Sequence, residues 1–196
     1  MKKLFFYTIT IITLLTVAGG KTFAQKEFTP DTTINNLFFL YDANSSEMFY
    51  PNINNIEIFD EELFSKGGTP HIIFFNADKT KYLVAFTHYG SCKNHFAEFE
   101  IGYVTEQVFN EVKNKHNETA YQDFQTESGL HLGMTLKELE RVKGKNYDRK
   151  GNVVTYIMND TISVFLNIYY NMPEYYLKCE LSQNKISKIK FGFTYP

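Results

Sequence analysis

Short segments rich in Phe, Tyr, Ile and Val, separated by polar turns, recur along most of the chain and constrain its fold more than any other feature. They cover residues 34–41, 53–59, 71–75, 81–87, 96–104, 153–158, 162–170, 175–181 and 186–193. Aromatic and β-branched side chains favour strands because they cover a pleated, half-buried surface. The expected fold class is therefore α+β, an antiparallel strand-rich sheet with one or two short helices packed on one face. The chain has 19 Phe and 14 Tyr but no Trp, so we assign the rings to core and cross-strand packing rather than to sugar binding.

Two of these segments also indicate that one face of the sheet is polar. The segment 96–104 alternates Phe99 with Glu98 and Glu100, and the last segment carries Lys188 and Lys190 among apolar residues. Successive side chains of a strand point to opposite faces. We therefore expect one face of each strand to meet solvent.

The clearest helix signal lies in the second half of the chain, over residues 135–144. Thr135 can cap a helix, and Glu138 three residues later completes a capping box. Gly144 can end the helix, and Gly133 before it suits an unusual backbone turn. One apolar stripe, made by Leu136, Leu139 and Val142, faces the sheet. Residues 105–115 fit either a helix or a strand.

The N-terminus has the features of a secretory signal peptide. Lys2 and Lys3 precede the apolar run 4–18, and small residues lie before a junction at Ala24. We expect cleavage between Ala24 and Gln25, and export to the periplasm or beyond. The alternative, a transmembrane anchor, is disfavoured because the run falls short of the roughly 20 apolar residues that span a bilayer. Residues 1–24 contain no cysteine to carry a lipid, so no stable membrane anchor is expected.

The sequence then predicts a signal peptide at residues 1–24 and a single α+β domain at residues 25–196. If that domain divides, the boundary falls near residues 115–128, where polar residues increase. Loss of Lys2, Lys3 and Lys21 takes the formal net charge from −2 to −5, since no acidic residue is lost with them. An acidic chain offers no electrostatic reason to bind nucleic acid.

The run from Gly129 to Leu139 contains Gly133-Met134-Thr135, and a helix and a strand meander follow it. This arrangement resembles an exported module of the small lipoproteins of the outer-membrane barrel-assembly machinery, and it is similar to β-lactamase-inhibitor-protein-like domains. The resemblance covers residues 126–196. It implies the fold and a binding function, and it carries over no catalytic residue. The chain departs from the pattern in lacking a lipid-bearing cysteine and a second copy of the module in residues 30–115.

The two cysteines leave two alternatives open. An even count in an oxidising compartment suggests a disulfide between Cys92 and Cys179. The other alternative is a pair of free thiols, one of them buried, because Cys179 lies in the middle of a predicted strand.

His88, Cys92 and His95 form the one cluster with ligand or nucleophile chemistry. A thiol beside two imidazoles can bind zinc or attack an acyl group, but this spacing matches no structural zinc pattern, and Gly90 and Ser91 indicate a loop. We therefore expect no catalytic residue, no metal and no cofactor. The function we expect is that of an exported non-catalytic binding protein that recognises another envelope or extracellular protein. The alternative is a small secreted hydrolase that uses the Cys92/His88/His95 region.

Overall fold

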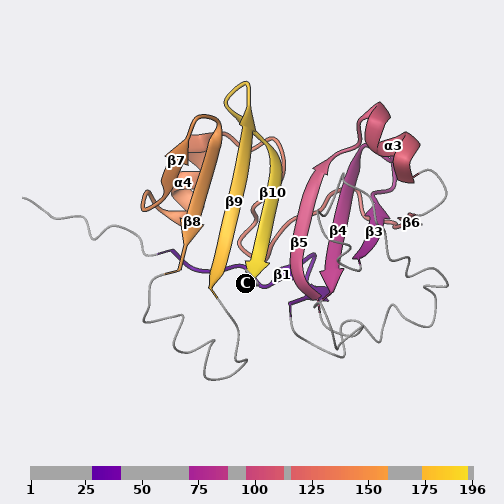
Figure 1. Ribbon diagram of the computed structural model, residues 1–196, viewed down its shortest axis with the longest axis horizontal. Helices are drawn as coiled ribbons and strands as arrows, with labels where there is room; N and C mark the ends of the chain where they lie inside the picture. Colours follow the sequence, from indigo (N-terminus) through magenta and orange to yellow (C-terminus); the bar gives the residue numbers. More distant parts are fainter. Residues whose placement is uncertain (1–27, 41–70, 88–95, 113–115, 159–173, 194–196) are drawn as a thin grey trace, which may run out of the picture.

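The computed structural model describes residues 28–40, 71–87, 96–112, 116–158 and 174–193 (Figure 1). Their main element is one eight-stranded sheet with the strand order β6-β3-β4-β5-β10-β9-β8-β7. Its strands are β3 (His71–Phe75), β4 (Lys81–Thr87), β5 (Phe96–Tyr103), β6 (Asn117–Glu118), β7 (Asp148–Lys150), β8 (Val153–Ile157), β9 (Tyr175–Ser182) and β10 (Lys185–Phe193). The other described elements are the strands β1 (Thr33–Ile34) and β2 (Phe38–Phe39) and the helices α3 (Glu106–Val112) and α4 (Leu136–Lys143).

The strand-rich α+β class is confirmed, but two details of the prediction are wrong. The sheet is mixed rather than purely antiparallel, because β6 pairs in parallel with the edge strand β3. The helices also lie on opposite faces of the sheet rather than on one. Val108 and Val112 of α3 belong to one apolar cluster with Val84, whereas Leu139 of α4 belongs to another with Leu83. Neighbouring residues of a strand point to opposite faces, so the two clusters lie on different sides of β4.

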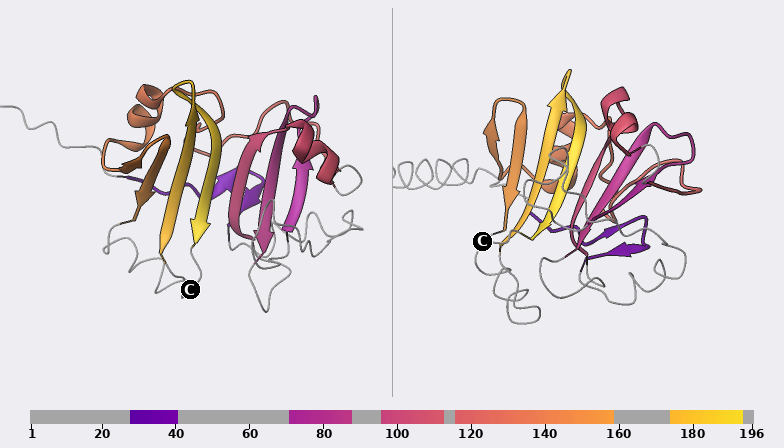
Figure 2. Two further views of the ribbon diagram at one scale, coloured as in Figure 1. Left: turned by 45° about the horizontal axis from the view of Figure 1, so that its top comes forward. Right: turned by 45° about the vertical axis from the view of Figure 1, so that its right-hand side comes forward.

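A hairpin replaces the strand predicted at residues 34–41. Asn35 and Asn36 have positive φ angles of 52° and 53°, and the Leu37 N–H donates to the Ile34 carbonyl at 3.0 Å. Asn tolerates this left-handed backbone better than most residues. The chain therefore turns back to pair β1 with β2, and Figure 2 shows this hairpin beside the main sheet.

The other predicted strands that fall on described residues are confirmed, with ends that shift by one residue at most. The predicted segments 53–59 and 162–170 lie outside the described residues. The capping box of α4 is present: Thr135 Oγ1 accepts from the Glu138 N–H at 3.3 Å, and the Glu138 carboxylate accepts from the Thr135 N–H at 2.8 Å. Gly133 and Gly144 have φ angles of 86° and 84°, as a turn before the helix and a stop after it require. The ambiguous segment 105–115 forms α3 over Glu106–Val112.

The main core lies between α4, the β1–β2 hairpin and the face of the sheet that they share. Its largest fully buried side chains include Tyr156, Tyr175, Phe99 and Phe191.

β5 pairs with β10 from Glu98 to Gly102, so one sheet contains strands from both sides of residues 115–128. The predicted division into a leader and a domain stays a prediction, because residues 1–27 lie outside the described ranges. In the described parts of the chain, no helix is long and apolar enough to span a membrane.

Candidate functional site

The residues singled out for chemistry fall mostly outside the described ranges. His88, Cys92 and His95 lie there, and so does the expected cleavage site at Ala24 and Gln25. The described segments contain no group of three or more His, Cys, Asp or Glu residues that could hold a metal ion.

Cys179 is described: it lies in the middle of β9 and forms no disulfide with another described residue. Its side chain is 0% exposed on the core face, and this burial raises the pKa of the thiol well above its ordinary value. A buried thiol that stays protonated is a poor nucleophile. Its disulfide to Cys92 stays a prediction.

The face of the sheet opposite α4 carries a group of charged side chains on β5, β10 and β9. We call this group the charged strip; its members are Glu98, Glu100, Lys178, Glu180, Lys188 and Lys190. The register brings them together. Lys190 pairs with Glu100 of β5 on one side and with Lys178 of β9 on the other. Since pairing residues share a face, Lys190 lies beside the opposite charge of Glu100 and the like charge of Lys178.

Three ion pairs connect the members of the charged strip. Lys190 Nζ lies 2.7 Å from Glu98 Oε1, Lys188 Nζ lies 3.4 Å from Glu100 Oε1, and Lys178 Nζ lies 3.8 Å from Glu180 Oε1. Lys190 Nζ also lies 4.9 Å from the centroid of the Phe86 ring, a favourable position for a cation over an aromatic face.

Two tyrosine hydroxyls fix the carboxylates of the charged strip. Tyr82 OH donates to Glu100 Oε1 at 2.9 Å, and Tyr176 OH donates to Glu98 Oε2. Burial, aided by the neighbouring carboxylates, raises the pKa of both tyrosines far above the ordinary value. Both hydroxyls therefore remain donors throughout the physiological pH range.

Gly102 on β5 makes the position of Tyr82 possible. A Cβ atom at Gly102 would lie 2.4 Å from the Tyr82 hydroxyl oxygen. The Tyr82 side chain therefore lies over β5, in the space that a side chain at position 102 would fill. The ring then reaches Glu100 on the same strand. No other residue type leaves this path open.

Exposure is graded across the charged strip. The side chain of Glu100 is 8% exposed, whereas those of Lys188 and Lys178 are 36% and 42% exposed. Glu98 and Glu100 are the more buried members of their ion pairs, whereas Glu180 is as exposed as Lys178. In this arrangement the strip can match the charges and hydrogen-bonding groups of another surface.

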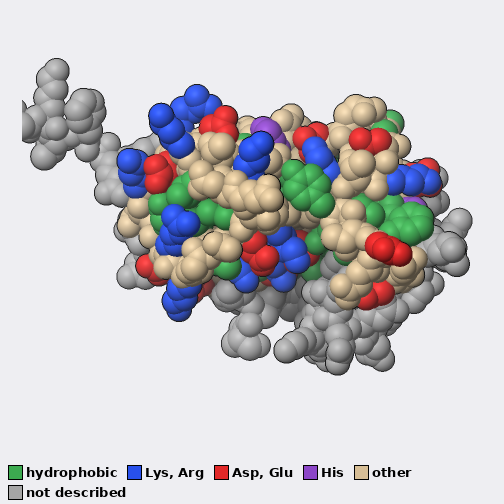
Figure 3. Space-filling model, turned by 90° about the horizontal axis from the view of Figure 1, so that it is seen from above, with side chains coloured by type: hydrophobic (Ala, Val, Ile, Leu, Met, Phe, Trp, Pro, Cys, Tyr) green, Lys and Arg blue, Asp and Glu red, His purple; other side chains and the backbone are tan. Residues whose placement is uncertain are grey.

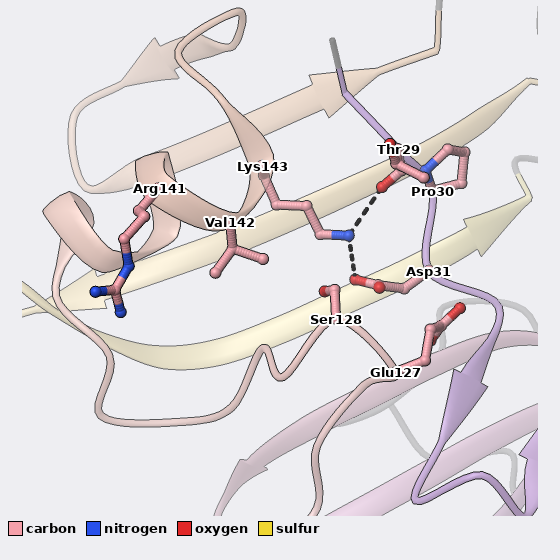
Figure 4. Close-up of a pocket in the computed structure, with 8 residues that line it drawn as sticks. All are labelled: Thr29, Pro30, Asp31, Glu127, Ser128, Arg141, Val142 and Lys143. Atoms are coloured by element: carbon pink, nitrogen blue, oxygen red, sulfur yellow. Dashed lines mark hydrogen bonds and ion pairs between the residues drawn. The ribbon is translucent and has the colours of Figure 1, made fainter. Parts of the chain in front are cut away.

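A second feature, a shallow depression of about 390 Å³, lies where the N-terminal segment meets α4 (Figure 4). Lys143 Nζ lies 2.7 Å from Asp31 Oδ2 and donates to the Thr29 carbonyl at 2.8 Å. Both charged side chains are 1% exposed. Figure 4 shows Lys143 extending from the end of α4 toward Asp31, with Ser128 and Glu127 beside the pair.

This buried pair has a structural role. The Asp31 carboxylate oxygens are sealed from solvent, so a ligand in the depression does not reach them. The backbone of Asp31 is also held, because its N–H donates to Tyr175 OH at 3.0 Å and its carbonyl accepts from the same hydroxyl at 2.7 Å. Glu127 accepts from the N–H groups of Thr32 and Thr33. These bonds attach the N-terminal segment to the rest of the fold.

No protein-family model, curated protein or solved structure matches this chain at a significant level. The resemblance of residues 126–196 to the exported module therefore remains an expectation.

Sequence reasoning found the polar alternation at Glu98, Glu100, Lys188 and Lys190 but missed Tyr82 and Tyr176. Only the strand order brings these tyrosines to the strip, and their local sequence is that of ordinary core strands.

Proposed function

We propose that this chain is an exported, non-catalytic binding protein that recognises another envelope or extracellular protein through the charged strip. The observation that supports this function is the construction of the strip itself. Its ion pairs and tyrosine hydroxyls hold six charged side chains in fixed positions on one face of β5, β10 and β9. Neither described helix covers this part of the sheet. Fixed complementary charges give specificity and favourable orientation in protein association.

The N-terminal sequence supports the export part of the proposal. A cationic start, an apolar run and small residues before Gln25 are typical of a cleaved signal peptide. Export would place the charged strip where envelope and extracellular proteins are available as partners. The alternative, a hydrolase that uses Cys92 with His88 or His95, is supported by the residue types in that segment alone.

Site-specific photo-crosslinking in the native bacterium tests the proposal. A photoreactive amino acid replaces Lys178 or Lys188, both partly exposed in the charged strip. The matched control replaces Lys79, which is 46% exposed at the turn between β3 and β4. We expect one discrete adduct from each strip position, in the exported fraction and on a chain that begins at Gln25, and none from the control.

The crosslinked partner, identified by mass spectrometry, is then purified and its affinity is measured. Lys188→Glu should weaken binding by at least about tenfold, because it sets a like charge beside Glu100 and Glu180. The proposal is wrong if the strip positions give no adduct that the control lacks, or if Lys188→Glu binds as well as the parent. A chain that keeps its leader inside the cell contradicts the export part. Loss of a cellular function in Cys92→Ser with unchanged partner affinity would favour the hydrolase.

A further inference from the structure

The first described residues of the chain lie in a slot built by α4, β8 and β9. The Phe28 ring is 6% exposed, and its centroid lies 5.1 Å from that of Tyr156 and 6.0 Å from that of Tyr175. Lys143 Nζ lies 5.7 Å from the centroid of the same ring and 2.7 Å from Asp31 Oδ2. We call Tyr156, Tyr175 and Lys143 the slot. The slot therefore holds an aromatic ring and a carboxylate that are three residues apart in the chain.

The segment that fills the slot is attached through side chains rather than through a strand ladder. Among the described residues, residues 28–31 form no hydrogen bond with another backbone group. The Tyr175 hydroxyl accepts from the Asp31 N–H and donates to the Asp31 carbonyl, and Lys143 donates to the Thr29 carbonyl. Pro30 has no N–H to satisfy and restricts the backbone between these contacts. A segment held in this way can leave the slot without disrupting the pairing of the sheet.

Two buried oxygen atoms in this part of the chain have no hydrogen-bond partner among the described residues. They are Asp31 Oδ1 and Thr33 Oγ1, and both are sealed from solvent. A sealed polar atom without a partner raises the free energy of the folded state. This offsets part of the favourable packing of the segment, so a state with the segment out of the slot lies closer in free energy than the buried contacts alone suggest.

We propose that the slot is a peptide-binding site that a single molecule fills with its own residues 28–31 and that the same residues of a second copy fill by exchange. An identical segment reproduces every contact of the slot, and exchange of an identical element between copies is a low-cost route to a dimer. Each copy gives one segment and receives one, so the dimer is symmetric. The slot belongs to the core cluster on the α4 face of the sheet, opposite the charged strip. The inference therefore holds whether or not the strip binds a partner.

A segment of a different protein fits the slot only if it carries the same pattern. A ring without the acid leaves Lys143 buried without its counter-ion, which is strongly unfavourable. An acid without the ring leaves the space beside Tyr156 and Tyr175 empty, and such a cavity is also unfavourable. The second copy meets both requirements by its sequence, and it is present wherever the chain is present.

Exchange is tested first on the parent chain, so that no variant has to fold. Unlabelled and isotope-labelled mature chains are mixed at high concentration and examined by native mass spectrometry. We expect dimers that contain one chain of each kind, in a fraction that rises with concentration. An excess of a peptide that covers residues 26–35 should lower this fraction at least about fivefold, because the peptide occupies the slot. The control peptide carries Phe28→Ala and Asp31→Ala and should leave the fraction unchanged.

Variants then locate the peptide. Fluorescence anisotropy measures the affinity for the same peptide, labelled at its C-terminal end. Phe28→Ala weakens the attachment of the chain's own segment. This variant should bind the peptide at least about tenfold more tightly than the parent, whose slot is open for only a fraction of the time.

The matched control is Phe109→Ala, which removes the same side chain from a position on α3 that is 38% exposed. Figure 3 shows hydrophobic side chains at the surface of the end of the molecule that carries α3. This variant should bind the peptide as weakly as the parent does. Circular dichroism verifies that both variants are folded.

Three results would overturn the inference. The first is a parent chain that stays monomeric, or whose dimers persist in excess peptide. The second is an equal peptide affinity in Phe28→Ala, Phe109→Ala and the parent. The third is a dimer that is as abundant in Phe28→Ala as in the parent. The crosslinking result at Lys178 and Lys188 does not enter this test, so the two proposals can fail separately.

Discussion

Lys143 at the end of α4 and Asp31 in the N-terminal segment form an ion pair of 2.7 Å that is almost completely buried. The ammonium group also donates to the Thr29 carbonyl and lies 5.7 Å from the centroid of the Phe28 ring. A charge buried with this many partners is tolerated, whereas one left alone is not. The pair therefore makes the N-terminal segment part of the folded domain.

Removing one member of the Asp31–Lys143 pair should destabilise the protein strongly. Lys143→Met leaves the Asp31 carboxylate buried without a counter-ion, and we expect a loss of about 3–5 kcal/mol in the free energy of unfolding. Urea denaturation measures this loss, and Lys137→Met on the exposed side of α4 is the control. The double variant Asp31→Val/Lys143→Met should recover much of the loss, because the unpaired charge is gone. A loss in Lys143→Met no larger than in the control would refute the buried pair.

Gly192 in β10 should tolerate no side chain. Its φ is 144°, and an added Cβ atom would lie 2.3 Å from the Ala97 carbonyl oxygen and 2.6 Å from the Glu98 Cα, both backbone atoms of β5. We expect Gly192→Ala to lower the free energy of unfolding by about 3 kcal/mol or more, because β5 and β10 must move apart to make room for the methyl group. Gly151→Ala is the comparison: its φ is also positive, but nothing lies within 4 Å, and it should cost about 1 kcal/mol. Equal costs in urea denaturation would contradict the close approach of β5 and β10.

The thiol of Cys179 should react only when the protein unfolds. Its burial excludes reagents and raises its pKa, so the reactive thiolate is scarce in the folded state. We expect a maleimide to label Cys179 in denaturant without any reductant, and to leave it unmodified in the native protein, as peptide mapping can show. Labelling that appears only after reduction would instead establish the disulfide to Cys92.

The capping box of α4 should make stability depend on pH through Glu138. The backbone N–H of Thr135, and then its hydroxyl, lower the pKa of this carboxyl below its ordinary value of 4.5. A folded-state pKa below the unfolded one means that the stabilisation is fully present above the unfolded pKa and is lost as pH falls through the folded pKa. The difference in unfolding free energy between the parent and Glu138→Gln should therefore persist at neutral pH and vanish in acid. An NMR titration in which Glu138 protonates at its ordinary pKa would contradict this.

Local signals in the sequence predicted local structure well. The capping box, the stop at Gly144 and the turn between β9 and β10 depend on residues close together in the chain, and all are present. The hairpin at Asn35 and Asn36 was missed because apolar residues on both sides gave the appearance of one strand. The adjacent pair of Asn residues was the available signal.

Features that depend on strand order could not be predicted in the same way. The sequence indicates that Glu98, Glu100, Lys188 and Lys190 are on polar faces, but their ion pairs require β10 to lie beside β5. The placement of α3 and α4 on opposite faces of the sheet also follows from the tertiary arrangement. The sequence of each helix indicates only that the helix has one apolar face. The partnership of Lys143 with Asp31 gave no signal, because a lysine in the last turn of a helix is usually exposed.

The central position of β10 has a consequence for how the molecule assembles. This strand is the last of the described strands along the chain, yet it lies between β5 and β9 and completes the ladder on both sides. Until it arrives, β5 presents an unsatisfied edge, and β3 to β5 remain disconnected from β7 to β9. Pairing over such a separation is entropically expensive and slow. Cooperative folding should thus await release of the chain at least as far as Phe193, whichever side of a membrane it reaches.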